Sequence, residues 1–113
     1  MNDINNLIEK IVEFRNNRDW DKFHDSKNLA LALSIEASEL NELFLWKNTP
    51  DEISSISKDR LSEELADVII YALLLAERNN LNITSIVEKK IIINSKNYPV
   101  EKSKGSAKKH SDL

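Results

Sequence analysis

Cysteine is absent from this sequence of 113 residues, and the helix breakers are scarce, with one Gly and two Pro. The absence of cysteine excludes disulfide bonds, thiolate catalysis and cysteine-ligated zinc sites. Because Gly and Pro are the residues that interrupt helices most strongly, their scarcity favours long uninterrupted helices. A chain without disulfides is typical of a reducing compartment, so we expect a cytoplasmic protein.

Long apolar runs are also lacking. The longest uncharged apolar run, Val68 to Ala76, has nine residues, whereas about 20 are needed to cross a bilayer, so we expect no membrane span. The formal net charge of −3 gives no support for nucleic-acid binding. The charge is uneven, however. From Lys89 onward seven lysines stand against two acids, a positive excess that can attract an anionic ligand.

The sequence does have apolar periodicity typical of helices. Hydrophobic residues make up 41% and charged residues 31%, which suits one globular domain. Apolar residues recur at three- and four-residue spacing in 3–18, 29–47, 62–79 and about 82–96, so we predict an all-α, four-helix-bundle-like fold. Suitable N-caps are Asp25 or Ser26, Ser57, and Asn82 or Thr84. We assign residues 1–98 to a helical catalytic domain and 99–113 to a polar, Lys-rich tail, which we expect to be mobile unless something orders it.

The third predicted helix is apolar on almost every side in the run VIIYALLLA, residues 68–76. A helix of this kind is buried all round. A bundle of 113 residues can seldom bury one helix completely. We therefore predict a subunit interface, and with it a homo-oligomer.

Two predicted helices carry carboxylates on faces that should be apolar. On a helical wheel Glu36 falls among leucine and alanine, and Glu39 lies about 60° from it. Glu64 and Asp67 are three residues apart and share a face of the third helix. If the two helices pack antiparallel, they can direct four carboxylates at one point.

Buried acids without partners are too costly to keep, so these four require cations. One alternative is ion pairing with Lys or Arg. The other is a divalent metal site, and carboxylates without Cys or paired His favour Mg²⁺, with Mn²⁺ also possible. The two histidines, His24 and His110, do not lie in Glu-x-x-His motifs, which disfavours a di-iron site. Because Mg²⁺ commonly shares its coordination with substrate phosphates, the site indicates a phosphorylated substrate, with one acid accepting a proton from water.

Six further side chains are candidates for substrate binding: Trp20, His24, Trp46, Tyr71, Lys90 and Asn94. Each tryptophan can stack on a nucleobase, although packing is the commoner role for a single Trp. A lone histidine in a loop is more often structural than catalytic. Tyr71 lies one turn after Asp67 and can contact an acid or a phosphate, or simply pack. Lys90 and Asn94 share a helix face and suit phosphate contact.

Four stretches of the chain resemble the MazG-like family of all-α nucleoside triphosphate pyrophosphohydrolases, close to its dCTP pyrophosphatase branch. They are RDWDKFH at 18–24, KNLALALSIEASELNELFLWK at 27–47, EELADVIIYALLLA at 63–76 and KKIIINSKNYPVEKSKGSAKK at 89–109. The paired Glu-x-x-Glu and Glu-x-x-Asp motifs, in this order and spacing, carry the resemblance. A single Glu-x-x-Glu motif would carry almost nothing.

The resemblance implies cleavage of a nucleoside triphosphate between its α and β phosphates, which yields a monophosphate and pyrophosphate. It implies that Glu36, Glu39, Glu64 and Asp67 hold Mg²⁺. It further implies a nucleotide pocket with Trp20, His24 and Trp46, phosphate contacts from Lys90 and Asn94, and a dimer or tetramer with sites near subunit contacts.

We therefore expect a Mg²⁺-dependent pyrophosphohydrolase acting in house-cleaning or control of dNTP pools, with dCTP-like substrates favoured. The alternative is a non-catalytic helical interaction or regulatory protein built on the same bundle. A nucleic-acid binder is a third possibility, which the acidic net charge disfavours.

Overall fold

The computed structural model describes residues 3–113, and these form helices and no strands. This confirms the predicted all-α fold. The elements are α1 (Asp3–Asn17), η1 (Asp21–Phe23), α2 (Ser26–Glu42), α3 (Pro50–Ser54), α4 (Lys58–Arg78), α5 (Ile83–Asn97), α6 (Val100–Ser103) and η2 (His110–Asp112). The chain divides into two compact units, Met1–Leu81 and Asn82–Leu113. Three of the four predicted long helices lie in the first unit, and the fourth, α5, lies in the second.

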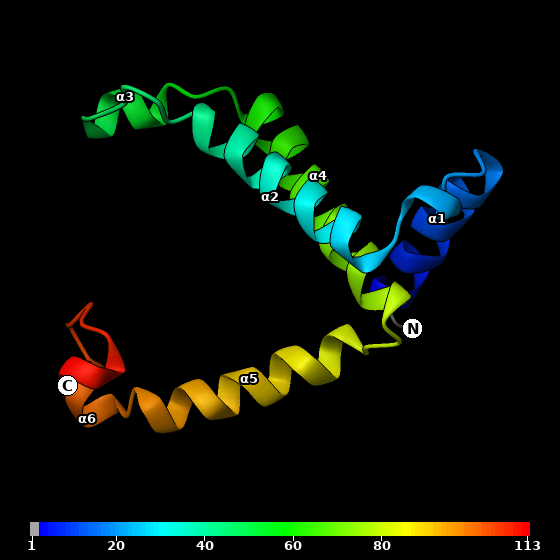
Figure 1. Ribbon diagram of the computed structural model, residues 1–113. Coiled ribbons are helices and arrows are strands. Elements are labelled where there is room, and N and C mark those ends of the chain that lie inside the picture. Colours follow the sequence, from blue (N-terminus) through cyan, green and yellow to red (C-terminus); the bar gives the residue numbers. More distant parts are fainter. Residues whose placement is uncertain (1–2) are drawn as a thin grey trace. The chain divides into compact units, whose positions relative to one another are not determined.

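The first unit is built around α2 and α4, which lie side by side (Figure 1). They run antiparallel, because Ser26 at the beginning of α2 meets Asn79 directly after α4, where the amide Nδ2 donates to the hydroxyl at 3.0 Å. The core lies between these helices. Leu29 is 1% exposed, and Leu73 and Leu74 are also buried. This packing places the middle of α2 against the first half of α4.

Side-chain caps fix where the long helices begin. Asp25 accepts a hydrogen bond from the backbone N–H of Asn28 at 2.7 Å, and α2 begins at the next residue. Ser57 caps α4 and Asn82 caps α5 in the same way. Each cap satisfies an N–H group that has no partner within the helix. All three were among the predicted caps.

The second helix ends earlier than predicted, at Glu42 instead of Lys47. From Leu43 the backbone N–H groups bond three residues back instead of four, with Leu43 to Leu40 at 3.2 Å and Phe44 to Asn41 at 3.0 Å. Trp46 then adopts a left-handed conformation with φ of 64°. The tighter turns stop the helix although the apolar spacing continues, so periodicity alone gave the wrong end.

The apolar run of α4 is buried on one side only within the described chain. Leu73, Leu74 and Ala76 are buried, whereas Leu65 is 44% and Ile69 47% exposed. The predicted subunit interface stays a prediction. Across residues 3–113, no helix combines the length and the apolar character that a membrane crossing demands.

The second unit consists of α5 and the C-terminal segment. Ile91 to Ile93 are helical in spite of their β-branched side chains, and no residue of α5 is buried. The segment after Pro99 contains α6 and η2, and the ring of His110 contacts Tyr98 edge-on, with centroids 5.7 Å apart. The composition change at Pro99 therefore falls inside a compact unit, whose boundary lies at Leu81.

Candidate functional site

Carboxylates from two helices converge in the first unit. Glu36 on α2 and Glu64 and Asp67 on α4 each offer an oxygen, and these oxygens lie within 4.8 Å of one another. The antiparallel packing of α2 and α4 produces this meeting, because it sets the middle of one helix beside the first half of the other. We call these three residues together with Glu39 the acid cluster.

Glu39 joins the cluster through Glu36. Burial raises the pKa of Glu36 above its ordinary value of 4.5, and a hydrogen bond with the Glu39 side chain raises it further. The charges of Glu39, Asp67 and Glu64 act in the same direction. A hydrogen bond between two carboxyls requires a proton on one of them. The carboxyl groups of the cluster therefore cannot all be ionised while this hydrogen bond is kept.

Within the first unit, no lysine or arginine among the described residues forms an ion pair with any of the four acids. The Glu64 Oε2 atom is buried and has no hydrogen-bond partner there. Burial raises the pKa of Glu64, as do the charges of Glu39 and Asp67, while the Arg60 charge lowers it. The ion-pairing alternative therefore finds no support within the first unit. A set of oxygen ligands with excess negative charge suits a hard cation.

A cavity of about 390 Å³ lies beside the acid cluster, and Asp67 belongs to both. Its walls come from α1, from the segment around η1 and from α4. Apolar side chains form most of the lining, among them Ile11, Phe14, Ile70 and Leu74. Trp20, His24 and Tyr71, which we predicted as substrate contacts, also line it. This volume falls within the range of small-molecule binding sites.

His24 and Tyr71 both line this cavity. Their rings meet edge-on with centroids 6.3 Å apart. The Nδ1 atom of His24 is buried and has no hydrogen-bond partner among the described residues. Burial raises the pKa of Tyr71, and the charges of Glu36 and Asp67 raise it further. The tyrosine hydroxyl therefore links the aromatic cavity to the acid cluster.

Lys10 is a cavity residue that the sequence analysis missed. It lies on α1 and lines the cavity with Leu7, Ile11 and Phe14. No ion pair or side-chain hydrogen bond of Lys10 is found within residues 3–113. The available signal was its spacing, because a lysine three residues after Leu7 and four before Phe14 lies on the apolar face of the first helix.

Trp46 does not line this cavity, contrary to the nucleotide pocket predicted with Trp20. It follows the C-terminal end of α2, whereas Trp20 precedes the beginning of that helix. A helix of 17 residues is about 25 Å long. Trp46 is 80% exposed and lines a separate hollow with Arg60. One chain therefore brings only one of the two tryptophans to the cavity.

Lys90 and Asn94 lie on α5 in the second unit, and both are exposed. They are four residues apart and therefore share one face of that helix, as predicted. Their role in phosphate binding stays a prediction.

Comparisons with known proteins give the family of the chain. A family model described as the MazG-like family matches residues 31–113, which is well over half of the chain. The chain belongs to the MazG-like family. The family assignment suggested by the paired acidic motifs is thereby confirmed.

Individual relatives agree with this assignment. The dCTP pyrophosphatase 1 of Rattus norvegicus is 43% identical over 106 residues, and that of Homo sapiens is 40% identical over 106 residues. Each match covers 90% of this chain but 62% of the relative, so the chain spans less than two thirds of their length. Among solved structures, a pyrophosphatase from Archaeoglobus fulgidus matches with a TM-score of 0.83 and 37% identity, over 88% of this chain and 94% of the other.

Proposed function

We propose that this chain is a Mg²⁺-dependent nucleotide pyrophosphohydrolase that converts a (d)NTP into a (d)NMP and pyrophosphate. The observation that carries the proposal is the junction at Asp67, where a cluster of unpaired carboxylates adjoins a largely apolar, aromatic-lined cavity. A nucleotide has these two needs, because its phosphates require cations and its base requires an apolar, stacking surface. The similarity to dCTP pyrophosphatases makes dCTP-like substrates the first to test.

We propose separate roles for the members of the acid cluster. Glu36, Glu64 and Asp67 would hold Mg²⁺, or Mn²⁺, since their oxygens already converge. When bound, the cation supplies positive charge that offsets the charge of the phosphate oxygens. Glu39 lies outside the converging trio, so its carboxylate is our candidate to accept a proton from the attacking water. The new P–O bond forms as the α–β anhydride bond breaks, and pyrophosphate leaves.

The cavity would bind the nucleoside. Trp20 offers a face for stacking on the base. His24 and Tyr71, which also line the cavity, are the candidates for hydrogen bonds to polar atoms of the ligand. Lys90 and Asn94 remain candidates for phosphate contact. Base and sugar preference then depend on how the cavity fits each nucleoside.

The proposed enzyme is a homodimer or homotetramer. Exposed apolar side chains recur at four-residue spacing on both core helices, with Leu31 and Ile35 on α2 at 55% and 50% exposure and Leu65 and Ile69 on α4. Exposed apolar patches of this kind mark association surfaces. Ile69→Asp should shift the protein toward monomer in sedimentation analysis. A mass unchanged by that substitution would contradict association through this face.

Pyrophosphate release from a panel of NTPs and dNTPs, including dCTP, 5-substituted dCTP and dUTP, tests the activity directly. Glu39→Gln and Asp67→Asn should abolish turnover while circular dichroism stays unchanged. Glu13→Gln on α1, outside the cluster, is the matched control and should retain full activity. If no nucleotide releases pyrophosphate, the proposed activity is wrong. If either cluster variant keeps full activity at saturating Mg²⁺, that residue has no part in the mechanism.

A further inference from the structure

Arg15 on α1 is the one buried charged residue among residues 3–113, with 7% of its surface exposed. Charged side chains are seldom buried unless they are paired. The Arg15 Nη1 donates to Oε2 of Glu77 on α4 at 2.9 Å. The same nitrogen lies 3.4 Å from Oδ1 of Asp21 in η1. One guanidinium thus connects α1 and the neighbouring η1 with α4, which is distant in the sequence.

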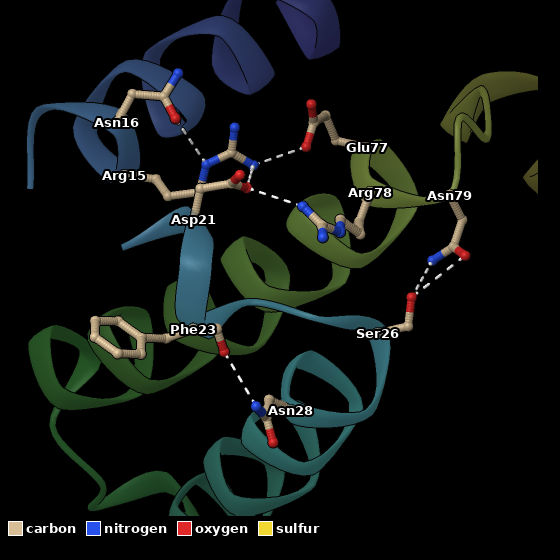
Figure 2. A network of polar contacts seen from close by, with 9 residues as sticks. All are labelled: Arg15, Asn16, Asp21, Phe23, Ser26, Asn28, Glu77, Arg78 and Asn79. Atoms are coloured by element: carbon tan, nitrogen blue, oxygen red, sulfur yellow. Dashed lines mark hydrogen bonds and ion pairs between the residues drawn. The ribbon is translucent and has the colours of Figure 1, made fainter. Parts of the chain in front are cut away.

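Asp21 is held from a second side. Nη1 of Arg78 donates to Oδ1 of Asp21 at 3.1 Å. Figure 2 shows the arrangement, with the Asp21 carboxylate next to both arginines and with Glu77 and Arg78 together on α4, facing Arg15 and Asp21. We call these four residues the charge quartet. Two positive and two negative groups balance, so the quartet needs no external ion.

The quartet lies next to the residues that form one wall of the cavity. Arg15 itself lines the cavity, as do Trp20 directly before Asp21 and His24 three residues after it. The Trp20 N–H donates to the Arg15 carbonyl at 3.1 Å. Apolar anchoring of this segment is weak, since Trp20 is 42% and Phe23 59% exposed. Polar ties therefore carry much of its attachment to α4.

We infer that Arg15 and Asp21 are positioning residues, which hold the segment 19–24 on α4 so that Trp20 and His24 stand in the cavity wall before a ligand arrives. The consequence for catalysis rests on the proposed function, whereas the attachment of the segment does not. A pre-ordered wall lowers the entropy lost on binding. Releasing it should therefore raise KM and leave kcat nearly unchanged, because the acid cluster lies on α2 and the first half of α4, and the segment 19–24 contributes none of its residues.

Tryptophan fluorescence tests the attachment without any nucleotide. The chain has two tryptophans, so Trp46→Phe leaves Trp20 as the single reporter. In that background, Asp21→Asn should increase acrylamide quenching, by up to about 2.4-fold if Trp20 goes from 42% to full exposure. Arg78→Gln, which removes the other tie of Asp21, should act in the same direction. Asp21→Glu keeps the charge and should restore the parental value.

Lys22→Gln is the matched control. Lys22 lies in the same segment and pairs with Asp19 at 3.0 Å, but both side chains are largely exposed and neither reaches α4. Its removal should leave quenching unchanged. Equal quenching in the parent, Asp21→Asn and Arg78→Gln proteins, with unchanged circular dichroism, would overturn the inference.

Steady-state kinetics with the nucleotide found by the panel test the consequence. Asp21→Asn in the otherwise natural sequence should raise KM about tenfold and change kcat less than twofold. If quenching increases but KM does not, the positioning role is overturned although the attachment is real. If the parent hydrolyses no nucleotide, the proposed function fails and the quenching result still decides whether the quartet holds the segment.

Discussion

Replacing Glu36 by Gln should make the metal-free protein more stable, although most substitutions at buried polar sites do the reverse. The Glu36 carboxylate lies within 4.8 Å of oxygens of Glu64 and Asp67. Two unit charges at that distance repel by about 0.9 kcal/mol in water and about 3.5 kcal/mol at an effective dielectric constant of 20. Glu36 is only half-buried, so solvent screening places the effect near the lower value. A glutamine amide can also donate to Glu39 without an added proton.

The expected gain is therefore about 1 kcal/mol, which corresponds to roughly 4 °C in Tm for a chain of this size. Thermal unfolding is followed by circular dichroism at pH 7.5, once with EDTA and once with 10 mM MgCl₂. The natural protein should gain stability from Mg²⁺, by about 1.4 kcal/mol when the ion is present at ten times its Kd. The Glu36→Gln variant should have a higher Tm than the natural protein in EDTA, and its Tm should rise little with Mg²⁺. Glu13→Gln should behave like the natural protein in both conditions.

Two outcomes of the thermal unfolding experiment would contradict this prediction. If Glu36→Gln lowers the Tm in EDTA and keeps the full Mg²⁺ response, the repulsion is not significant and Glu36 is not a ligand. If it raises the Tm in EDTA but still responds fully to Mg²⁺, the repulsion is real and the ion binds elsewhere.

Three other predictions concern pH, the core and the cavity. Because the pKa values of Glu36 and Glu64 are raised in the folded state, their contribution to stability is fully present below their ordinary value of 4.5 and is lost as pH rises through the raised values. This contribution to the Tm of the metal-free protein should therefore be present at pH 4.5 and lost by pH 7.5, and Glu36→Gln should reduce the difference. Leu29→Ala removes a side chain that is 1% exposed and should cost about 3 kcal/mol in urea unfolding, while Leu81→Ala, at 48% exposure, should cost under about 1 kcal/mol. Lys10→Met removes a positive charge from the cavity lining, so the KM for a nucleoside triphosphate, which is an anion, should rise severalfold in steady-state kinetics.

The acid cluster was predictable from sequence because it depends mainly on the spacing of residues that are close together in the chain. A three-residue spacing places Glu64 and Asp67 on one face, and one antiparallel helix contact then suffices to bring Glu36 beside them. The helix caps were predictable for the same reason, since each depends on residues no more than three apart. The cavity residues around η1 were suspected only because aromatics are unusual in a short polar connection.

The other residues of the cavity and the charge quartet were not predictable, because their positions depend on contacts between residues that are far apart in the sequence. Arg15 and Glu77 are 62 residues apart, and nothing near either residue predicts that they meet. Lys10 belongs to the cavity only because α1 packs beside α4. The end of the second helix was misplaced because the apolar period continues beyond Glu42 while the hydrogen bonds change to a tighter turn. In that case local geometry overrode a pattern that was otherwise reliable.

The charge quartet and the acid cluster are the two polar groups discussed in the first unit, and they differ in their balance of charge. The charge quartet combines two arginines with two acids, and every charge has a partner within hydrogen-bonding or ion-pairing distance. The acid cluster has four acids, no ion-pairing cation within the described part of the first unit and a buried carboxylate oxygen without a partner there. Both groups involve α4, so within this unit complementary charge is placed beside the C-terminal end of that helix and not beside its first half. The balanced quartet can stabilise the fold by itself, whereas the unbalanced acid cluster lowers the stability of the isolated unit and supports our proposal that a cation binds there.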